Sequence, residues 1–168
     1  MITFQEGNAR FTYRVAGIAL RSDRVLLHRM IHDNFWSIPR GRGKLLEPSR
    51  ETLRREMREE LGINVEIGRL LWVVENFFVH GGVHYHELGL YYLMSFPSDC
   101  PLYHTEGPFL GDEEGIELIF KWHQLDDLEE TALYPSFLRQ ALASIPETIQ
   151  HIMHRDGWGR RLPRPLNL

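Results

Sequence analysis

Residues 41–63 constrain the fold of this chain more than any other segment, because they predict a loop that leads into one helix with an acidic face. Pro48 and Ser49 suit the start of a helix, and Gly62 suits the left-handed residue that follows a helix end. The sequence therefore predicts a helix from about residue 49 to residue 61.

The two sides of this helix differ in character. With about 100° of rotation per residue, Leu53, Met57 and Leu61 form one apolar stripe. Arg54, Arg58 and Arg55 follow around the helix, and three carboxylates occupy the remaining arc. We expect the carboxylates to converge beside the chain that enters from Gly41 while the stripe packs on the fold. These carboxylates belong to Glu56, Glu59 and Glu60.

Folding alone does not favour this acidic arc. Glu56 and Glu60 are like charges one turn apart near the helix C-terminus, where the helix dipole also disfavours negative charge. Hard divalent cations such as Mg²⁺ or Mn²⁺ take oxygen ligands and offset the repulsion. For residues 54–60 taken alone, an ordinary solvated helix face remains the simpler interpretation.

The longer spacing favours the metal interpretation. It follows G-x5-E-x7-R-E-U-x-E-E-x-G-U, where U is a bulky aliphatic residue, and a chance match in a chain of this length is on the order of one in ten million. The matching residues are Gly41, Glu47, Arg55, Glu56, Met57, Glu59, Glu60, Gly62 and Ile63. This pattern resembles the signature of the Nudix hydrolases, the MutT-type pyrophosphohydrolases. The resemblance implies an α/β fold, a Nudix-type α/β/α sandwich with a mixed sheet.

The resemblance also implies roles for the box residues. Glu59 and Glu60 correspond to ligands of Mg²⁺ or Mn²⁺, and Glu56 corresponds either to a third ligand or to the residue that activates water. Arg55 and Glu47 are expected to pair and to support the site.

The loop before the helix supplies further candidates. Gly41 allows the backbone to approach a metal closely, which makes the carbonyl oxygen of Arg40 a possible ligand. The side chains of Arg40 and Arg42 are candidates for phosphate contacts, although a solvated basic loop fits equally well. Trp36 is a candidate for stacking on a base, with a packing role as its alternative.

Carboxylates outside the box are also candidates. Relatives often use a further glutamate downstream, and here Glu113, Glu114 and Glu117 qualify, each with a solvated surface position as its alternative. Glu75 and Glu87 interrupt apolar strands, where an unpaired carboxylate is costly, so they face either the site or solvent.

Three histidines, His80, His84 and His86, surround a predicted glycine turn and could suggest zinc. No cysteine accompanies them, so a polar surface role is the preferred interpretation.

The rest of the chain predicts strands around the helix. Strands are expected over 11–20, 24–29, 64–79, 83–96 and 117–123, with hairpin turns at 21–23 and 81–82. Residues 97–115 predict a surface loop, and residues 135–145 and 146–155 predict two short helices. The pattern favours a mixed sheet between helical layers.

Composition limits the functional classes. The 168 residues predict a single Nudix domain over 1–168, and the net charge of −4 provides no basic face for duplex nucleic acid. No apolar run is long enough for a membrane span, and no secretory signal is evident, so we expect a cytoplasmic protein with a small nucleotide as partner. The tail from Arg155 onward could cover a substrate, mediate a homodimer or remain a loose terminus.

Two functional hypotheses follow. One is metal-dependent hydrolysis, by attack of water on phosphorus, of a nucleoside diphosphate linked to another group: a nucleotide sugar, ADP-ribose, a dinucleotide or a nucleoside triphosphate. The other is a catalytically silent Nudix-like binding or regulatory module. The complete set of box glutamates favours the enzyme. Positions some 15 to 18 places after the box sort relatives by substrate, but Phe78, Val79, His80 and Gly81 match none of the family markers.

Overall fold

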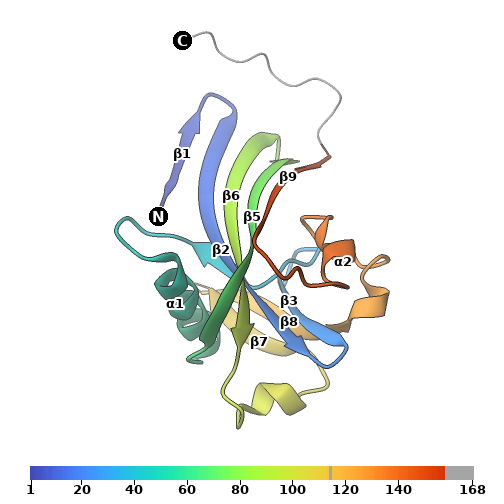
Figure 1. Ribbon diagram of the computed structural model, residues 1–168. Helices are drawn as coiled ribbons and strands as arrows, with labels where there is room; N and C mark the ends of the chain where they lie inside the picture. Colours follow the sequence, from blue (N-terminus) through green and yellow to red (C-terminus); the bar gives the residue numbers. More distant parts are fainter. Residues whose placement is uncertain (114, 158–168) are drawn as a thin grey trace.

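A computed structural model describes residues 1–113 and 115–157 of the protein. A mixed sheet runs through the centre, and helices α1 (Ser49–Leu61) and α2 (Leu138–Ala141) lie on opposite sides of it (Figure 1). The α/β/α sandwich with a mixed sheet that the sequence predicted is therefore confirmed. No helix in the described residues is long and apolar enough to cross a bilayer.

Along the sheet the strands follow the order β7-β8-β3-β2-β6-β5-β9, with β1 and β4 also paired to β2. The pairs β2–β6 and β5–β9 are parallel, and the other pairs are antiparallel. The strands are β1 (Thr3–Glu6), β2 (Ala9–Arg21), β3 (Arg24–Met30), β4 (Arg40–Arg42), β5 (Glu66–His80), β6 (Val83–Ser95), β7 (Phe109–Glu113), β8 (Ile116–Gln124) and β9 (Gln150–Asp156).

Helix α1 has the predicted bounds. It ends at Gly62, whose φ of 69° is the left-handed conformation that glycine adopts without strain. Leu53 and Met57 are fully buried and pack on one face of the sheet in the first apolar core. The second core lies on the other face, where Leu138 of α2 packs near Ile18 and Val74.

Both predicted hairpins form. Gly81 and Gly82 turn β5 into β6 with φ values of 56° and 78°, as a tight antiparallel turn requires. The first hairpin differs from expectation because β2 and β3 pair only next to the turn, at Leu20–Val25 and Arg21–Arg24. Beyond that point β3 separates from β2, and β4 takes the vacated edge of β2 through the pair of Val15 with Gly41.

Two expectations for the second half of the chain are wrong. Residues 146–155 were predicted as helix, but Gln150–Asp156 forms β9, which pairs in parallel with β5 from Trp72 to Phe78. Its residues alternate between more and less exposed positions, and pairing with an open sheet edge outweighs weak helix propensity. In 135–145, the α-helix proper is confined to the four residues of α2.

The predicted surface loop at 97–115 is more ordered than expected. It contains a short 3-10 helix over Pro101–His104, and its last residues form β7. Strand β7 pairs with β8 through Phe109 and Phe120, whose rings stack with centroids 5.7 Å apart. This apolar pair across two strands favours a strand at residues 109–113, although the prolines and acidic residues of the segment favoured a loop.

Candidate active site

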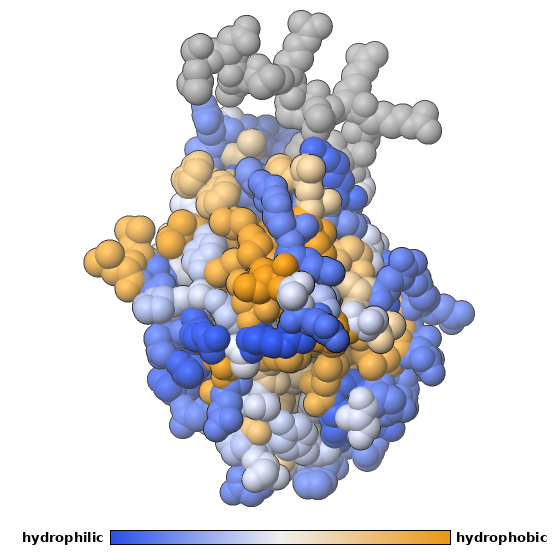
Figure 2. Space-filling model, in the orientation of Figure 1, coloured by the Kyte–Doolittle hydropathy of each residue, from blue (hydrophilic) through white to orange (hydrophobic). Residues whose placement is uncertain are grey.

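The acidic side of α1 packs against the junction where β3 leaves β2 and β4 replaces it. Figure 2 shows a hydrophilic surface over α1 and a hydrophobic projection at the left, the side on which Figure 1 has the loop between β4 and α1. Leu45 and Leu46 of this loop are exposed. The glutamates of the helix differ in exposure. Glu56 and Glu60 are each 4% exposed, whereas the side chain of Glu59 is 55% exposed.

Gly41 lets Glu56 reach the sheet. A Cβ atom at residue 41 would lie 1.8 Å from the Glu56 carboxyl carbon and 2.3 Å from its Oε1. The carboxylate therefore lies where any other residue would place its side chain, directly against the backbone of β4. The sequence predicted that Gly41 lets the backbone approach a metal closely; in the structure the group that lies against this backbone is the Glu56 carboxylate.

Arg55 connects the loop to the helix. Its Nε and Nη2 donate to the two carboxylate oxygens of Glu47 at 2.8 and 3.1 Å, as the sequence predicted. Its Nη1 donates to Glu56 at 2.7 Å and to Glu59 at 3.0 Å, and Nη2 also donates to the carbonyl oxygen of Arg42 at 3.0 Å. One guanidinium thus holds three carboxylates and the strand that precedes the helix.

The pKa values of two carboxyl groups that Arg55 contacts, those of Glu47 and Glu56, shift in opposite directions. The hydrogen bond from Arg55 lowers the pKa of Glu47 to about 2, so Glu47 stays charged. Burial raises the pKa of Glu56, and the Arg55 hydrogen bond only partly opposes this effect. A carboxyl group with a raised pKa beside the other glutamates is suited to accept a proton.

Glu60 faces the sheet rather than solvent. Its Oε2 lies 3.7 Å from Nδ1 of His28, a buried residue of β3. His28 also lines a large cavity on the other side of the junction, so Glu60 and the cavity are separated by one side chain.

The chemistry of these residues fits a hard divalent cation. Glu56, Glu59 and Glu60 supply carboxylate oxygens, and the space that a Cβ would fill at Gly41 holds the Glu56 carboxylate against the β4 backbone. Within the described residues, no group of three His, Cys, Asp or Glu side chains is already gathered around one point. Because Arg55 holds Glu56 and Glu59, these side chains would have to rotate to share an ion.

The cavity has a volume of about 490 Å³, within the range of small-molecule sites. It opens where β2 and β3 diverge, and β5, β6, the loop after β3 and the end of β9 complete its walls. Residues that line it include Arg14, His28, Phe35, Ser37, Arg40, Asn76, Phe78, His80, Tyr85, Tyr134, Pro135 and Asp156. Of the four positions at which relatives are sorted by substrate, Phe78, Val79 and His80 line this cavity.

An ion-pair group forms part of the cavity floor. Glu87 is 1% exposed, and its carboxylate accepts a hydrogen bond from Arg40 at 3.0 Å and lies 3.1 Å from Nε of Arg14. Glu87 therefore does not face solvent, as one of its two interpretations had it: it lies buried beneath Arg14 and Arg40, which line the cavity. Two arginines against one glutamate leave the floor with positive charge, which attracts an anionic substrate.

The loop candidates separate in space. Arg40 reaches the cavity through its side chain, while its backbone lies next to Gly41 at the acidic cluster. Arg42 is half-buried and contributes its carbonyl oxygen to Arg55. Trp36 packs against the second core, with its ring 4.5 Å from that of His123, and does not line the cavity, whereas its neighbour Phe35 does.

The downstream glutamates differ in where the structure places them. Glu117 is exposed and lies on the face of β8 opposite Leu118, a cavity residue. Glu113 lies in β7, and Glu114 falls outside the described residues. Glu75 faces β9, where His151 lies 3.0 Å from its carboxylate.

The histidines of the β5–β6 hairpin do not gather as a metal site in the described chain. His86 stacks on Phe77 with ring centroids 4.5 Å apart, and His80 packs edge-on against Phe35 at 6.2 Å. Most of the tail that was considered for covering a substrate or for a homodimer, residues 158–168, lies outside the described residues.

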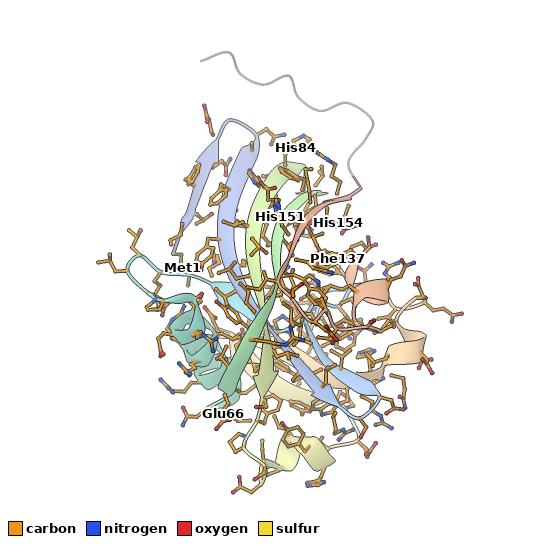
Figure 3. The ribbon with its side chains drawn as sticks, viewed as in Figure 1. Met1, Glu66, His84, Phe137, His151 and His154 are labelled. Atoms are coloured by element: carbon orange, nitrogen blue, oxygen red, sulfur yellow. The ribbon has the colours of Figure 1, made fainter. Side chains whose placement is uncertain are left out.

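The cavity residues that sequence reasoning missed include Arg14, His28 and Asn76. Each is a polar residue inside an apolar strand, and that interruption was the available signal. A second missed group includes Asp156, which lines the cavity. Ser136 lies 3.1 Å from Nε2 of His154, which is 3.0 Å from Asp156. His154 of β9 lies near Phe137, with ring centroids 5.4 Å apart (Figure 3).

Comparisons with known proteins agree with this geometry. The family model described as NUDIX domain matches residues 11–144. Over 62 residues, the chain is 36% identical to a Bacillus subtilis (strain 168) protein named putative ADP-ribose pyrophosphatase YjhB. That match covers 37% of this chain and only 30% of the relative.

Solved structures share the fold at low identity. A MutT NUDIX hydrolase from Burkholderia pseudomallei is 23% identical, with a TM-score of 0.57 over 80% of this chain and 98% of that one. An ADP-ribose pyrophosphatase from Streptococcus suis 89-1591 is 17% identical, with a TM-score of 0.52 over 84% of this chain and 98% of that one. A UDP-X diphosphatase is 15% identical, with a TM-score of 0.54 over 84% of this chain and 66% of that one.

The family match spans the whole acidic helix and most of the strands that line the cavity, but not β9. On this match, the protein belongs to the NUDIX domain family.

Proposed function

We propose that the protein hydrolyses the diphosphate linkage of a nucleoside diphosphate joined to another group, with Mg²⁺ or Mn²⁺ as cofactor. The observation that carries the proposal is one juxtaposition. The acidic side of α1 and the positively charged cavity floor meet at Arg40, whose backbone adjoins Glu56 and whose side chain contacts Glu87.

In this proposal Glu56, Glu59 and Glu60 hold the cation, with the carbonyl oxygen of Arg40 as a further donor. When bound, a divalent ion neutralises charge on phosphate oxygens and lowers the pKa of coordinated water. Glu56 is the residue suited to take a proton from the attacking water, because burial raises its pKa. Arg55 and Glu47 keep the loop and the helix in register.

The cavity supplies binding and orientation. Arg14 and Arg40 attract the anionic part of the substrate, and the aromatic walls exclude water from the organic part. Cys100 is buried in the first core, away from these residues, so direct attack by water on phosphorus is preferred to a covalent intermediate on that thiol.

A phosphate-release screen with Mg²⁺ and with Mn²⁺, coupled to a phosphomonoesterase that frees phosphate from the monophosphate products, tests the proposal. ADP-ribose and UDP-linked compounds come first because the names of similar proteins mention them, followed by dinucleotides and nucleoside triphosphates. We expect hydrolysis that stops in chelator, and ¹⁸O from labelled water on phosphorus of one product in a single turnover. Activity that persists in chelator, or label that appears first on the protein, would refute the mechanism. Binding of these compounds without turnover would instead identify a silent binding module.

A further inference from the structure

Asn76 is a buried polar residue with an unusual position on β5. It is 3% exposed and lines the cavity, yet its Oδ1 accepts no hydrogen bond from the described residues. A buried amide oxygen without a donor destabilises the folded protein, so such atoms in native proteins call for an explanation. An apolar residue would have been the stable choice at this position.

The neighbours of Asn76 show where its side chain points. Val74, Asn76 and Phe78 share one face of β5, since side chains alternate along a strand. Val74 belongs to the second core, whereas Asn76 and Phe78 line the cavity. The same sheet face therefore changes from protein core to ligand surface at Asn76. Its neighbours across the sheet are Glu87 on β6 and His154 on β9.

The other polar groups on this floor already have partners. Glu87 interacts with both Arg14 and Arg40, so this carboxylate and these guanidinium groups are engaged with one another. The amide of Asn76, whose oxygen lacks a donor in the described residues, can therefore recognise an uncharged polar edge. An asparagine amide presents one acceptor and two donors, which suits a ring that offers a donor next to an acceptor.

The walls beside Asn76 are flat and aromatic. Phe78 and Tyr85 stack with ring centroids 4.8 Å apart and an interplanar angle of 3°. Phe35 packs edge-on against Tyr134 with centroids 6.0 Å apart. Flat walls of this kind stack on a planar heterocycle and provide no hydrogen bonds of their own to its edge.

Resting on the proposed function, we infer that this cavity binds the base of the nucleotide substrate, and that Asn76 selects adenine. The amide oxygen accepts from the exocyclic amino group, and the amide nitrogen donates to the adjacent ring nitrogen, which is the usual bidentate pairing of asparagine with adenine. Guanine is favoured by a free arginine, but Arg14 and Arg40 are engaged with Glu87. Asn76 is therefore a specificity residue, and the acidic helix acts on the phosphates.

Calorimetric titration of the full chain in chelator tests the inference without turnover. The probes are AMP and purine riboside 5′-monophosphate, which lacks only the amino group. We expect the wild type to bind AMP more tightly, on the order of ten-fold. Asn76→Leu should bind both probes with the weaker affinity, and its free form should melt at the same or a higher temperature, because the orphaned oxygen is gone.

Thr12→Val is the matched control. Thr12 is also 3% exposed with an Oγ1 that lacks a hydrogen bond in the described residues, but it does not line the cavity. This variant should keep the preference for AMP. If Asn76→Leu does not fold, the affinities of the wild type for the two probes still show whether the amino group of adenine is recognised. Asn76→Asp, which keeps the acceptor oxygen, should then retain part of the preference for AMP.

Several results would overturn the inference: equal binding of the two probes, GMP, CMP or UMP binding as tightly as AMP, no binding of AMP, or an Asn76→Leu variant with the wild-type preference. The proposed function fails separately. A preference for AMP that depends on Asn76, without hydrolysis of any diphosphate compound, would remove the catalytic proposal and leave the base site. Hydrolysis without a preference for adenine would support the catalytic proposal and remove the base site.

Discussion

Gly41→Ala should damage the candidate metal site while leaving the fold intact. The added Cβ would lie 1.8 Å from the carboxyl carbon of Glu56, whereas carbon atoms pack at about 3.5–4.0 Å. The carboxylate must therefore move by roughly 2 Å. The backbone of Gly41 is not in the left-handed region, so alanine at this position adds no backbone strain. Because the clash is with the end of a flexible side chain, we expect a loss of stability of only about 1–3 kcal/mol.

The effect on function should be larger. A displacement of about 1 Å in a catalytic group can cost on the order of 100-fold in rate, so kcat/KM should fall at least that far on the substrate that the screen identifies. Mn²⁺ binding, followed by electron paramagnetic resonance, should weaken in parallel and requires no substrate. Gly107→Ala is the control, because its Cβ meets nothing within 4 Å. Near-normal Mn²⁺ affinity and turnover in Gly41→Ala would refute the placement of Glu56 at the metal site.

Three further predictions concern the same region and the second core. Glu60→Gln and Glu59→Gln should each lower turnover on the order of 100-fold or more. Only Glu60→Gln should raise the melting temperature in chelator, because Glu60 is buried near another carboxylate and Glu59 is exposed. A similar shift of the melting temperature in both variants would contradict this difference in burial. Arg55→Ala should lower the free energy of unfolding by about 3 kcal/mol and reduce activity, because three carboxylates lose their hydrogen bonds to the guanidinium. Urea unfolding of this variant is compared with that of the control Arg54→Ala, whose side chain is more exposed. Burial lowers the pKa of His123 to about 4 from 6.5, so the unfolded chain takes up a proton first and stability should fall as the pH drops from 6.5 towards 4. In His123→Gln this fall should be shallower, and equal slopes in urea unfolding at pH 7 and pH 5 would show that His123 does not contribute.

The sequence alone determined the local features of the protein. The bounds of α1 and the left-handed Gly62 follow from helix signals that act within a few residues of one another. The glycine turn of the second hairpin and the pairing of Arg55 with Glu47 were predictable for the same reason, because each depends on a short span or on a family pattern of fixed spacing.

The sequence failed where distant segments compete for the same partner. Nothing within residues 146–155 indicates that an open edge of β5 is available, so the pairing that makes β9 is invisible locally. The cavity depends on the early separation of β3 from β2, which draws β4 onto the free edge and carries Gly41 to Glu56. Periodicity shows only that a side chain is on a given face, not whether that face meets core, solvent or a cavity.

Burial and partners of the charged residues were likewise a tertiary matter. The sequence grouped Glu56, Glu59 and Glu60 as equivalent carboxylates, but packing against β3 and β4 buries two of them and leaves Glu59 exposed. Glu87 was ambiguous as a strand carboxylate until β2 and β4 brought two arginines to it. The residue types with the chemistry are therefore set by the sequence, whereas their protonation, exposure and shared cavity arise only when strands far apart in the chain meet.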